Sequence, residues 1–195
     1  MINDLVQEIK ETMDANGYVF FDNDKAYNLN IIGLRNKEQH PNEFDDLLIL
    51  VYKDLGKRWN VRMYPITTDA GIYWLKNPMN YKGTASLKEG QYRSTWKIGK
   101  HKGKYDALVQ CKQVQVYRDN DKDKIFDYED AVIYTGYFGI NIHRSHPRTE
   151  KVKVNTYSAG CQVFANPDDF KDFMRIIKVS AQRFGNSFTY TLIRR

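Results

Sequence analysis

Cysteine is scarce in this chain of 195 residues, which contains only Cys111 and Cys161. Small secreted domains held together by disulfides carry more cysteines at characteristic spacings, so that class of scaffold is excluded. No apolar run approaches the ~20 residues that a membrane-spanning helix requires, and we expect no membrane span. The first residues also lack the basic segment and apolar run of a signal peptide, so we expect synthesis in the cytoplasm.

Long blocks of one charge are also absent. The formal net charge of +6 suits an anionic partner, but lysine and arginine are scattered along the chain, and we expect no nucleic-acid binding. No group of His, Cys or Asp residues has the spacing of a zinc site. A phosphate-binding loop and a dinucleotide-binding fingerprint are missing too. The sequence therefore predicts no required cofactor.

Aromatic residues are plentiful by contrast, with 14 Tyr, 10 Phe and 3 Trp. Together with runs of Val, Ile and Thr they favour a sheet-rich fold. The chain is long enough to bury one hydrophobic core without metal or disulfide. We predict a β-rich α+β protein in which residues 1–58, a helix and strands, pack on the same core as residues 59–195.

Local patterns predict the elements. Residues 3–16 form an amphipathic pattern that Asn3 caps and Gly17 ends, and a second helix begins at Asn166 and Pro167 and ends at Gly185. Strands are predicted at residues 18–21, 28–34, 47–52, 59–64, 107–118, 139–144 and 188–193, with a hairpin turn at 53–57 and long loops over 65–104.

The candidate chemistry lies in the turn of residues 157–162, which delivers Cys161. Gly160 allows a tight bend that aims backbone N–H groups at one point. A thiol attacks as its thiolate and needs a base beside it, and His143, at the end of a predicted strand, is the candidate. The alternative is that Cys161 is a small buried residue and His143 a structural strand histidine.

His143 followed by Ser158-Ala159-Gly160-Cys161 resembles the signature of L,D-transpeptidase (YkuD-like) catalytic domains of bacterial cell walls, a His and then Ser-His-Gly-Cys. The resemblance covers roughly residues 60–193, with weaker similarity at 64–68 and 83–85. Ala159 stands where the signature has a second His, and Gln162 begins a segment that lacks the family's arginine. The chain thus resembles a diverged member, of phage type if it acts without an export signal.

The resemblance implies a mixed β-sandwich or barrel with an N-terminal helix and a C-terminal helix after the nucleophile turn. It implies that a cysteine thioester forms on a peptidoglycan stem peptide, leading to cross-linking or hydrolysis, after release by lysis or from a virion. The residues implied as catalytic are Cys161, His143, Gly160 and Ser158, and those implied to bind substrate are Arg144, Tyr137, Ala159 and Gln162. The alternative is a structural or binding module that keeps this fold without turnover.

Other residues have side chains that could bind a metal ion or act as a base. Asp119, Asp121 and Asp123, with Asp130 in the twelfth place, resemble a Ca²⁺ loop, but Lys124 stands where such a loop has Gly. A solvated acidic turn is the preferred interpretation, and bound Ca²⁺ is the alternative. His101 is expected in an exposed loop, with a role in a pocket as its alternative. His146 is a rival base, and Cys111 is expected in the core.

Overall fold

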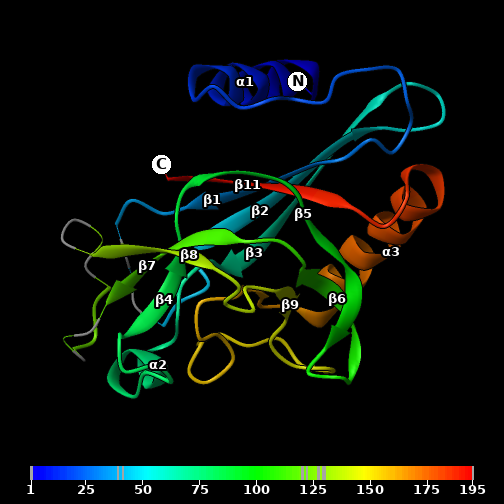
Figure 1. Ribbon diagram of the computed structural model, residues 1–195. Helices are drawn as coiled ribbons and strands as arrows, with labels where there is room; N and C mark the ends of the chain where they lie inside the picture. Colours follow the sequence, from blue (N-terminus) through cyan, green and yellow to red (C-terminus); the bar gives the residue numbers. More distant parts are fainter. Residues whose placement is uncertain are drawn as a thin grey trace.

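The computed structural model describes residues 2–38, 40, 42–119, 121, 123–126, 128 and 131–194, which form three helices and eleven strands (Figure 1). The helices are α1 (Ile2–Ala15), α2 (Ile72–Lys76) and α3 (Pro167–Phe184). The strands are β1 (Asn30–Arg35), β2 (Asp46–Lys53), β3 (Trp59–Thr67), β4 (Thr84–Leu87), β5 (Gly90–His101), β6 (Tyr105–Gln110), β7 (Val114–Asp119), β8 (Val132–Gly136), β9 (Ile142–Arg144), β10 (Gln162–Phe164) and β11 (Phe188–Arg194). No helix among these residues is long and apolar enough to cross a membrane.

Eight strands close into a barrel in the order β1-β11-β5-β6-β9-β10-β3-β2. The β1–β11 and β9–β10 pairs are parallel, and the other neighbours are antiparallel. Side chains fill the interior of a barrel of this size, and here they include Trp96, Tyr190 and Phe164. The prediction of a β-rich α+β protein is confirmed. A second sheet, β4-β7-β8, lies outside the barrel.

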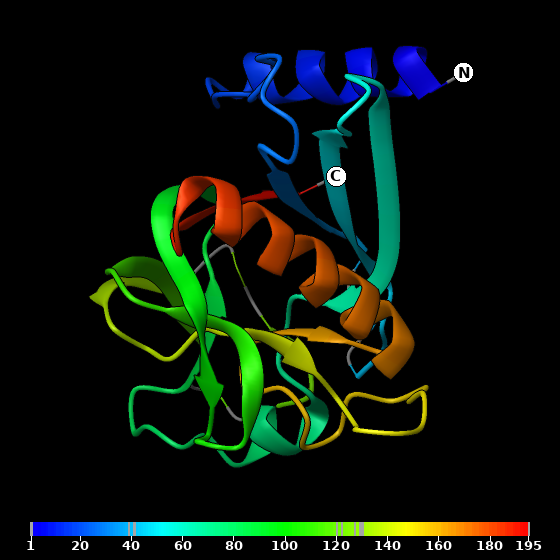
Figure 2. The same ribbon diagram turned by 90° about the vertical axis from the view of Figure 1, so that its right-hand side faces the viewer.

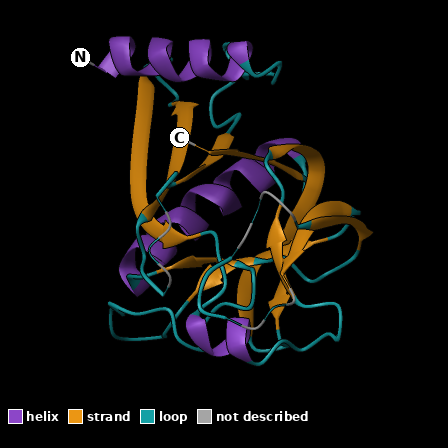
Figure 3. Ribbon diagram, turned by 90° about the vertical axis from the view of Figure 1, so that its left-hand side faces the viewer, coloured by secondary structure: helices purple, strands orange, loops and turns teal. Residues whose placement is uncertain are grey.

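Strand β2 is buried on both faces because its apolar residues alternate between two cores. Leu48 and Leu50 belong to the barrel core, whereas Ile49 and Val51 face α1. Figure 3 shows α1 at one end of the molecule and α2 at the other. The boundary between residues 58 and 59 falls within the β2–β3 hairpin, and both of its strands belong to the barrel.

Helix α3 follows β10 directly and crosses one side of the barrel (Figure 2). The Asn166 side chain accepts a hydrogen bond from the Asp168 N–H, and Pro167 occupies the first turn. The apolar face of α3 enters the barrel core through Phe170, Phe173, Ile176 and Ile177. The predicted helix after the nucleophile turn is therefore confirmed.

The other predicted elements are confirmed only in part. The predicted strand at 107–118 is two strands, β6 and β7, in different sheets, because the Gln110 side chain donates to the Lys112 carbonyl where the chain turns. The expected long loops over 65–104 are wrong, since β4 and β5 lie there. Residues 18–21 form no strand, and the Phe21 N–H donates to the Asn30 side chain. Strands β8 and β10 were not predicted.

Candidate active site

The parallel pairing of β9 and β10 brings the two predicted catalytic side chains to one region. His143 pairs with Val163, and Cys161 directly precedes β10. Side chains alternate along a strand, so His143 and Cys161 share a face, with a stagger of two residues, or ~6.6 Å at ~3.3 Å per residue. The barrel register therefore supports the predicted neighbourhood of Cys161 and His143.

The Cys161 sulfur lies among backbone groups of the segment before β9. Its Sγ accepts from the Asn141 N–H at 3.4 Å and donates to the Gly139 carbonyl at 3.4 Å. Burial raises the pKa of the Cys161 thiol, while the Asn141 N–H and the Lys102 charge act in the opposite direction. Among the described residues, no hydrogen bond joins this sulfur to the His143 ring. The resting group is a neutral thiol.

The His143 ring is 5% exposed, and its tautomer follows from its partner. Nδ1 lies 2.9 Å from the Arg144 carbonyl, which can only accept, so Nδ1 carries the proton and Nε2 has the free lone pair. The Tyr105 hydroxyl donates to the same carbonyl at 3.2 Å. Burial, with a smaller contribution from His101, lowers the His143 pKa to about 3, so the ring is neutral at pH 7.

His101 lies in a different environment from the one that its sequence context predicts. It was expected in an exposed loop, yet it ends β5, pairs with Tyr105 across the β5–β6 hairpin and is 6% exposed. Its ring stacks on His143 with centroids 3.9 Å apart. The hairpin causes the burial, because it folds His101 back over β9; its sequence signal was the short Lys-Gly-Lys turn between His101 and Tyr105.

Asn141 fixes the tautomer of His101. The Asn141 Oδ1 accepts from the Gln110 N–H at 3.0 Å, so its Nδ2 is the group that donates to His101 Nδ1 at 3.1 Å. His101 therefore carries its proton on Nε2, the opposite of His143. Burial lowers the His101 pKa to about 4. Asn141 thus contacts both His101, through its side chain, and the Cys161 sulfur, through its backbone.

The turn before Cys161 is held by Ser158 and Gly160. The Ser158 hydroxyl is fully buried, donates to the Cys161 carbonyl at 2.9 Å and accepts from the Gly160 N–H at 3.2 Å. Gly160 has φ +112°, and a Cβ there would collide with the Ala85 carbonyl oxygen. Glycine is therefore required by both conformation and space. Both residues shape the turn that presents Cys161.

A cleft of about 400 Å³ opens beside this turn. Ala159 and Tyr137, two of the residues predicted to bind substrate, both line it, and Tyr137 is 67% exposed. Its other lining residues include Trp74, Met79, Arg118 and Phe138. The cleft has the size of a small-ligand site, and both polar and apolar groups line it.

Two predicted substrate-binding residues lie elsewhere. Gln162 is fully buried in the barrel, where its Oε1 accepts from the Tyr190 hydroxyl at 2.9 Å, so its predicted contact with substrate is wrong. The Arg144 guanidinium lies over the Tyr105 ring at 4.3 Å and lines a different cleft, beside α3. Arg144 contributes its backbone carbonyl, which orients His143.

The remaining candidates are accounted for by local structure. His146 is half-buried, and its Nδ1 accepts from the Arg148 and Thr149 N–H groups of its own loop. Cys111 is half-buried, with its sulfur 3.2 Å from the Thr95 carbonyl, and not the core residue expected.

The acidic turn brings three carboxylates together: one oxygen each of Asp119, Asp121 and Asp123 lies within 4.8 Å of the others. Asp119 accepts from the Asp121 N–H, and Asp121 from the Asp123 N–H, the pattern of consecutive Asx turns. Local turn formation explains this arrangement. Asp130 lies outside the described residues.

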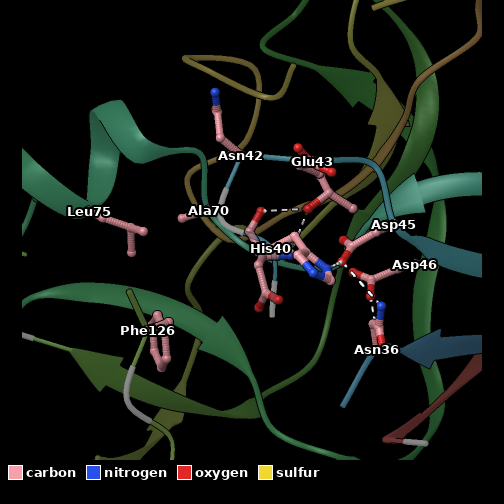
Figure 4. A pocket seen from close by; sticks show the side chains of 11 residues that line it. Asn36, His40, Asn42, Glu43, Asp45, Asp46, Ala70, Leu75 and Phe126 are labelled. Carbon is pink, nitrogen blue, oxygen red and sulfur yellow. Dashed lines mark hydrogen bonds and ion pairs between the residues drawn. The ribbon is translucent and has the colours of Figure 1, made fainter. Parts of the chain in front are cut away.

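A separate acidic cavity is drawn in Figure 4. The ring of His40 points to Asp45, with Nδ1 3.1 Å from Oδ2, and Asp46 accepts from the Asn36 N–H at 2.7 Å. The cavity has a volume of about 20 Å³, which is room for about one water molecule. It is too small for a substrate, and the cleft at Ala159 remains the candidate site.

Comparison with protein-family models, with curated proteins and with solved structures gives no match for this chain.

Proposed function

We propose that the protein is a cysteine-nucleophile enzyme of the L,D-transpeptidase type, acting on peptidoglycan stem peptides through a thioester. The observation that carries the proposal is the pairing of β9 with β10, which places Cys161 and a correctly protonated His143 on one face. The enzyme would reach the cell wall after lysis or from a virion.

The reaction needs one proton carrier. Cys161 gives its proton to His143 Nε2 while its sulfur attacks the scissile carbonyl. The tetrahedral intermediate expels the amine, which takes the proton from His143 and leaves the thioester. An acceptor amine or water then attacks, gives a proton to His143, and releases the product; the thiolate regains the proton. An amine acceptor gives transpeptidation and water gives hydrolysis.

The protonation states determine when the thiolate forms. The Cys161 pKa is raised and the His143 pKa is about 3, so transfer of the proton in the free protein is strongly unfavourable. The thiolate is therefore formed only as the carbon–sulfur bond forms. The Cys161 sulfur must also leave the Gly139 carbonyl and turn toward the His143 ring.

The oxyanion would be stabilised by few donors. The Gly160 N–H already donates a hydrogen bond to the Ser158 hydroxyl, so the Cys161 N–H is the backbone donor of the turn that could contact the oxyanion. The Tyr137 hydroxyl on the exposed side of the cleft is the second candidate. Loss of one such donor lowers kcat by roughly 10²–10³.

Incubation with purified muropeptides, followed by mass spectrometry, tests the proposal. The wild type should exchange, remove or cross-link a stem residue, and a peptide containing Cys161 should carry the acyl group. Cys161→Ala and His143→Gln should both abolish turnover, while Cys111→Ala should retain it. Turnover that survives Cys161→Ala would refute the proposed nucleophile.

A second candidate is a binding module without turnover. It is favoured by the raised thiol pKa and by the missing hydrogen bond between Cys161 and His143 among the described residues. This candidate predicts binding of muropeptides with unchanged ligand masses and no acyl adduct on Cys161. The same mass spectra therefore separate the two functions.

A further inference from the structure

Arg118 on β7 lines the cleft beside the nucleophile turn. Its Nη1 donates to the Gly83 carbonyl at 2.6 Å, and its Cζ lies 5.3 Å from the centre of the Phe138 ring. A guanidinium has five N–H donors, and that of Arg118 makes no other hydrogen bond with the described residues. It therefore keeps donors for a ligand.

The positive charge of Arg118 has no acidic partner in the described part of the chain. None of the residues lining the cleft is acidic, and no described carboxylate contributes to the electrostatics of Arg118. Partial burial lowers the Arg118 pKa. The buried Arg35 is different, because its Nη1 pairs with Glu89 at 2.8 Å. A half-buried arginine that has no counter-ion among the described residues favours an anionic ligand.

Arg118 is connected to Cys161 through two short paths. Ala85 of β4 pairs with Arg118, and the Ala85 carbonyl packs against Gly160. Phe138, beneath the guanidinium, precedes Gly139, whose carbonyl accepts from the Cys161 thiol. The arginine and the nucleophile thus border the same region.

We propose that Arg118 binds a free carboxylate of the substrate, close to the carbonyl that Cys161 attacks. This inference rests on the proposed function for the nature of the substrate. Arginine binds carboxylates through two parallel N–H donors, which fixes orientation as well as charge. The preferred substrates are therefore peptides ending in a free carboxylate near the scissile bond, and the amine released is a single amino acid. That favours terminal exchange or carboxypeptidase action over cleavage of cross-links.

Ligand binding to the Cys161→Ala variant tests the carboxylate site, because this variant lacks the nucleophile and cannot form the thioester. The probes are N-acetyl-L-alanyl-D-alanine and its C-terminal amide, followed by the NMR shift of the Trp74 indole N–H, which lines the cleft and donates to the Thr156 carbonyl. A hydrogen bond to a charged group contributes about 1.5–3 kcal/mol, so the acid should bind at least roughly tenfold more tightly than the amide. Adding Arg118→Gln should remove that preference, and Arg118→Lys should retain part of it.

The matched control is Arg62→Gln, an exposed arginine on β3 outside the cleft, which should leave the preference unchanged. Equal affinity for acid and amide, no binding of either at millimolar concentration, or a preference that survives Arg118→Gln would overturn the inference. Circular dichroism checks that each variant is folded. If the protein turns over muropeptides but binds acid and amide equally, the carboxylate site is refuted and the proposed function stands. If the protein prefers the acid but turns over no muropeptide, the proposed function is refuted and the carboxylate site stands.

Discussion

The imidazole rings of His101 and His143 stack with centroids 3.9 Å apart and planes inclined by 23°. Their protons lie on different nitrogens: Nδ1 of His143 donates to the Arg144 carbonyl, and Nδ1 of His101 accepts from Asn141. Two imidazolium ions at this distance would repel each other strongly. Stacking and burial together therefore hold both rings neutral, which is the form that a general base requires.

Acidification should destabilise the protein through these two rings. The pKa values are about 3 for His143 and about 4 for His101 in the folded state, against ~6.5 for unfolded histidine. Below pH ~6.5 the unfolded chain binds more protons, so the free energy of unfolding falls as the pH drops toward ~4. Each ring contributes a slope of up to ~1.4 kcal/mol per pH unit. Urea unfolding at pH 7, 6 and 5 measures it.

Asp46 acts in the opposite direction, because burial raises its pKa to about 7 and favours the folded state on acidification. Variants isolate the histidines: His143→Gln and His101→Gln should each make the pH dependence shallower between pH 6.5 and 4. Curves parallel to that of the wild type would show that the rings titrate normally.

Asn141→Asp should raise the pKa of His101. The introduced carboxylate would keep an acceptor for the Gln110 N–H but lose the N–H that Asn141 donates to His101 Nδ1. It would also place a negative charge beside the ring, which favours the imidazolium form. Titration of the His101 Cε1–H by NMR should show a pKa well above 4 in this variant. The control Asn141→Ala removes the donor without adding charge and should give the smaller rise.

Gly160→Ala should destabilise the protein more than Gly103→Ala. Both glycines have positive φ, +112° and +72°, but a Cβ at Gly103 has open space whereas one at Gly160 meets the Ala85 carbonyl. A left-handed conformation alone costs about 1–2 kcal/mol for a non-glycine residue. Urea unfolding should therefore give a loss of that size for Gly103→Ala and a larger one for Gly160→Ala. Equal losses would mean that β4 moves aside easily.

The local signals of the sequence predicted much of the fold. Asn166, Pro167 and Gly185 mark both ends of α3, and the uninterrupted apolar run in β2 marks a buried strand, because these signals act within a few residues. The turn at Gly160 was predicted for the same reason. The contact between Gly160 and the Ala85 carbonyl was not predicted, because the two residues lie far apart in the sequence.

Strand pairing between distant parts of the chain determines the positions of the residues that local sequence patterns did not place. His101 looked like a loop residue because its neighbours are Lys and Gly, and only the β5–β6 hairpin folds it onto His143. Arg118 belonged to a regular alternating run, and its place in the cleft depends on the separate β4-β7-β8 sheet. Gln162 adjoins the nucleophile, yet the alternation of β10 turns it into the barrel.

The buried pair of Gln162 and Tyr190 should show strong coupling. The Tyr190 hydroxyl donates to Gln162 Oε1 at 2.9 Å, and Gln162 Nε2 has no partner among the described residues. Tyr190→Phe leaves a buried acceptor without a donor, and Gln162→Met leaves a buried hydroxyl without an acceptor, each at a cost of about 1–3 kcal/mol. The double variant removes both groups and the unpaired Nε2, so its loss in urea unfolding should be smaller than the sum of the single losses. Additive losses would contradict the hydrogen bond as the source of the effect.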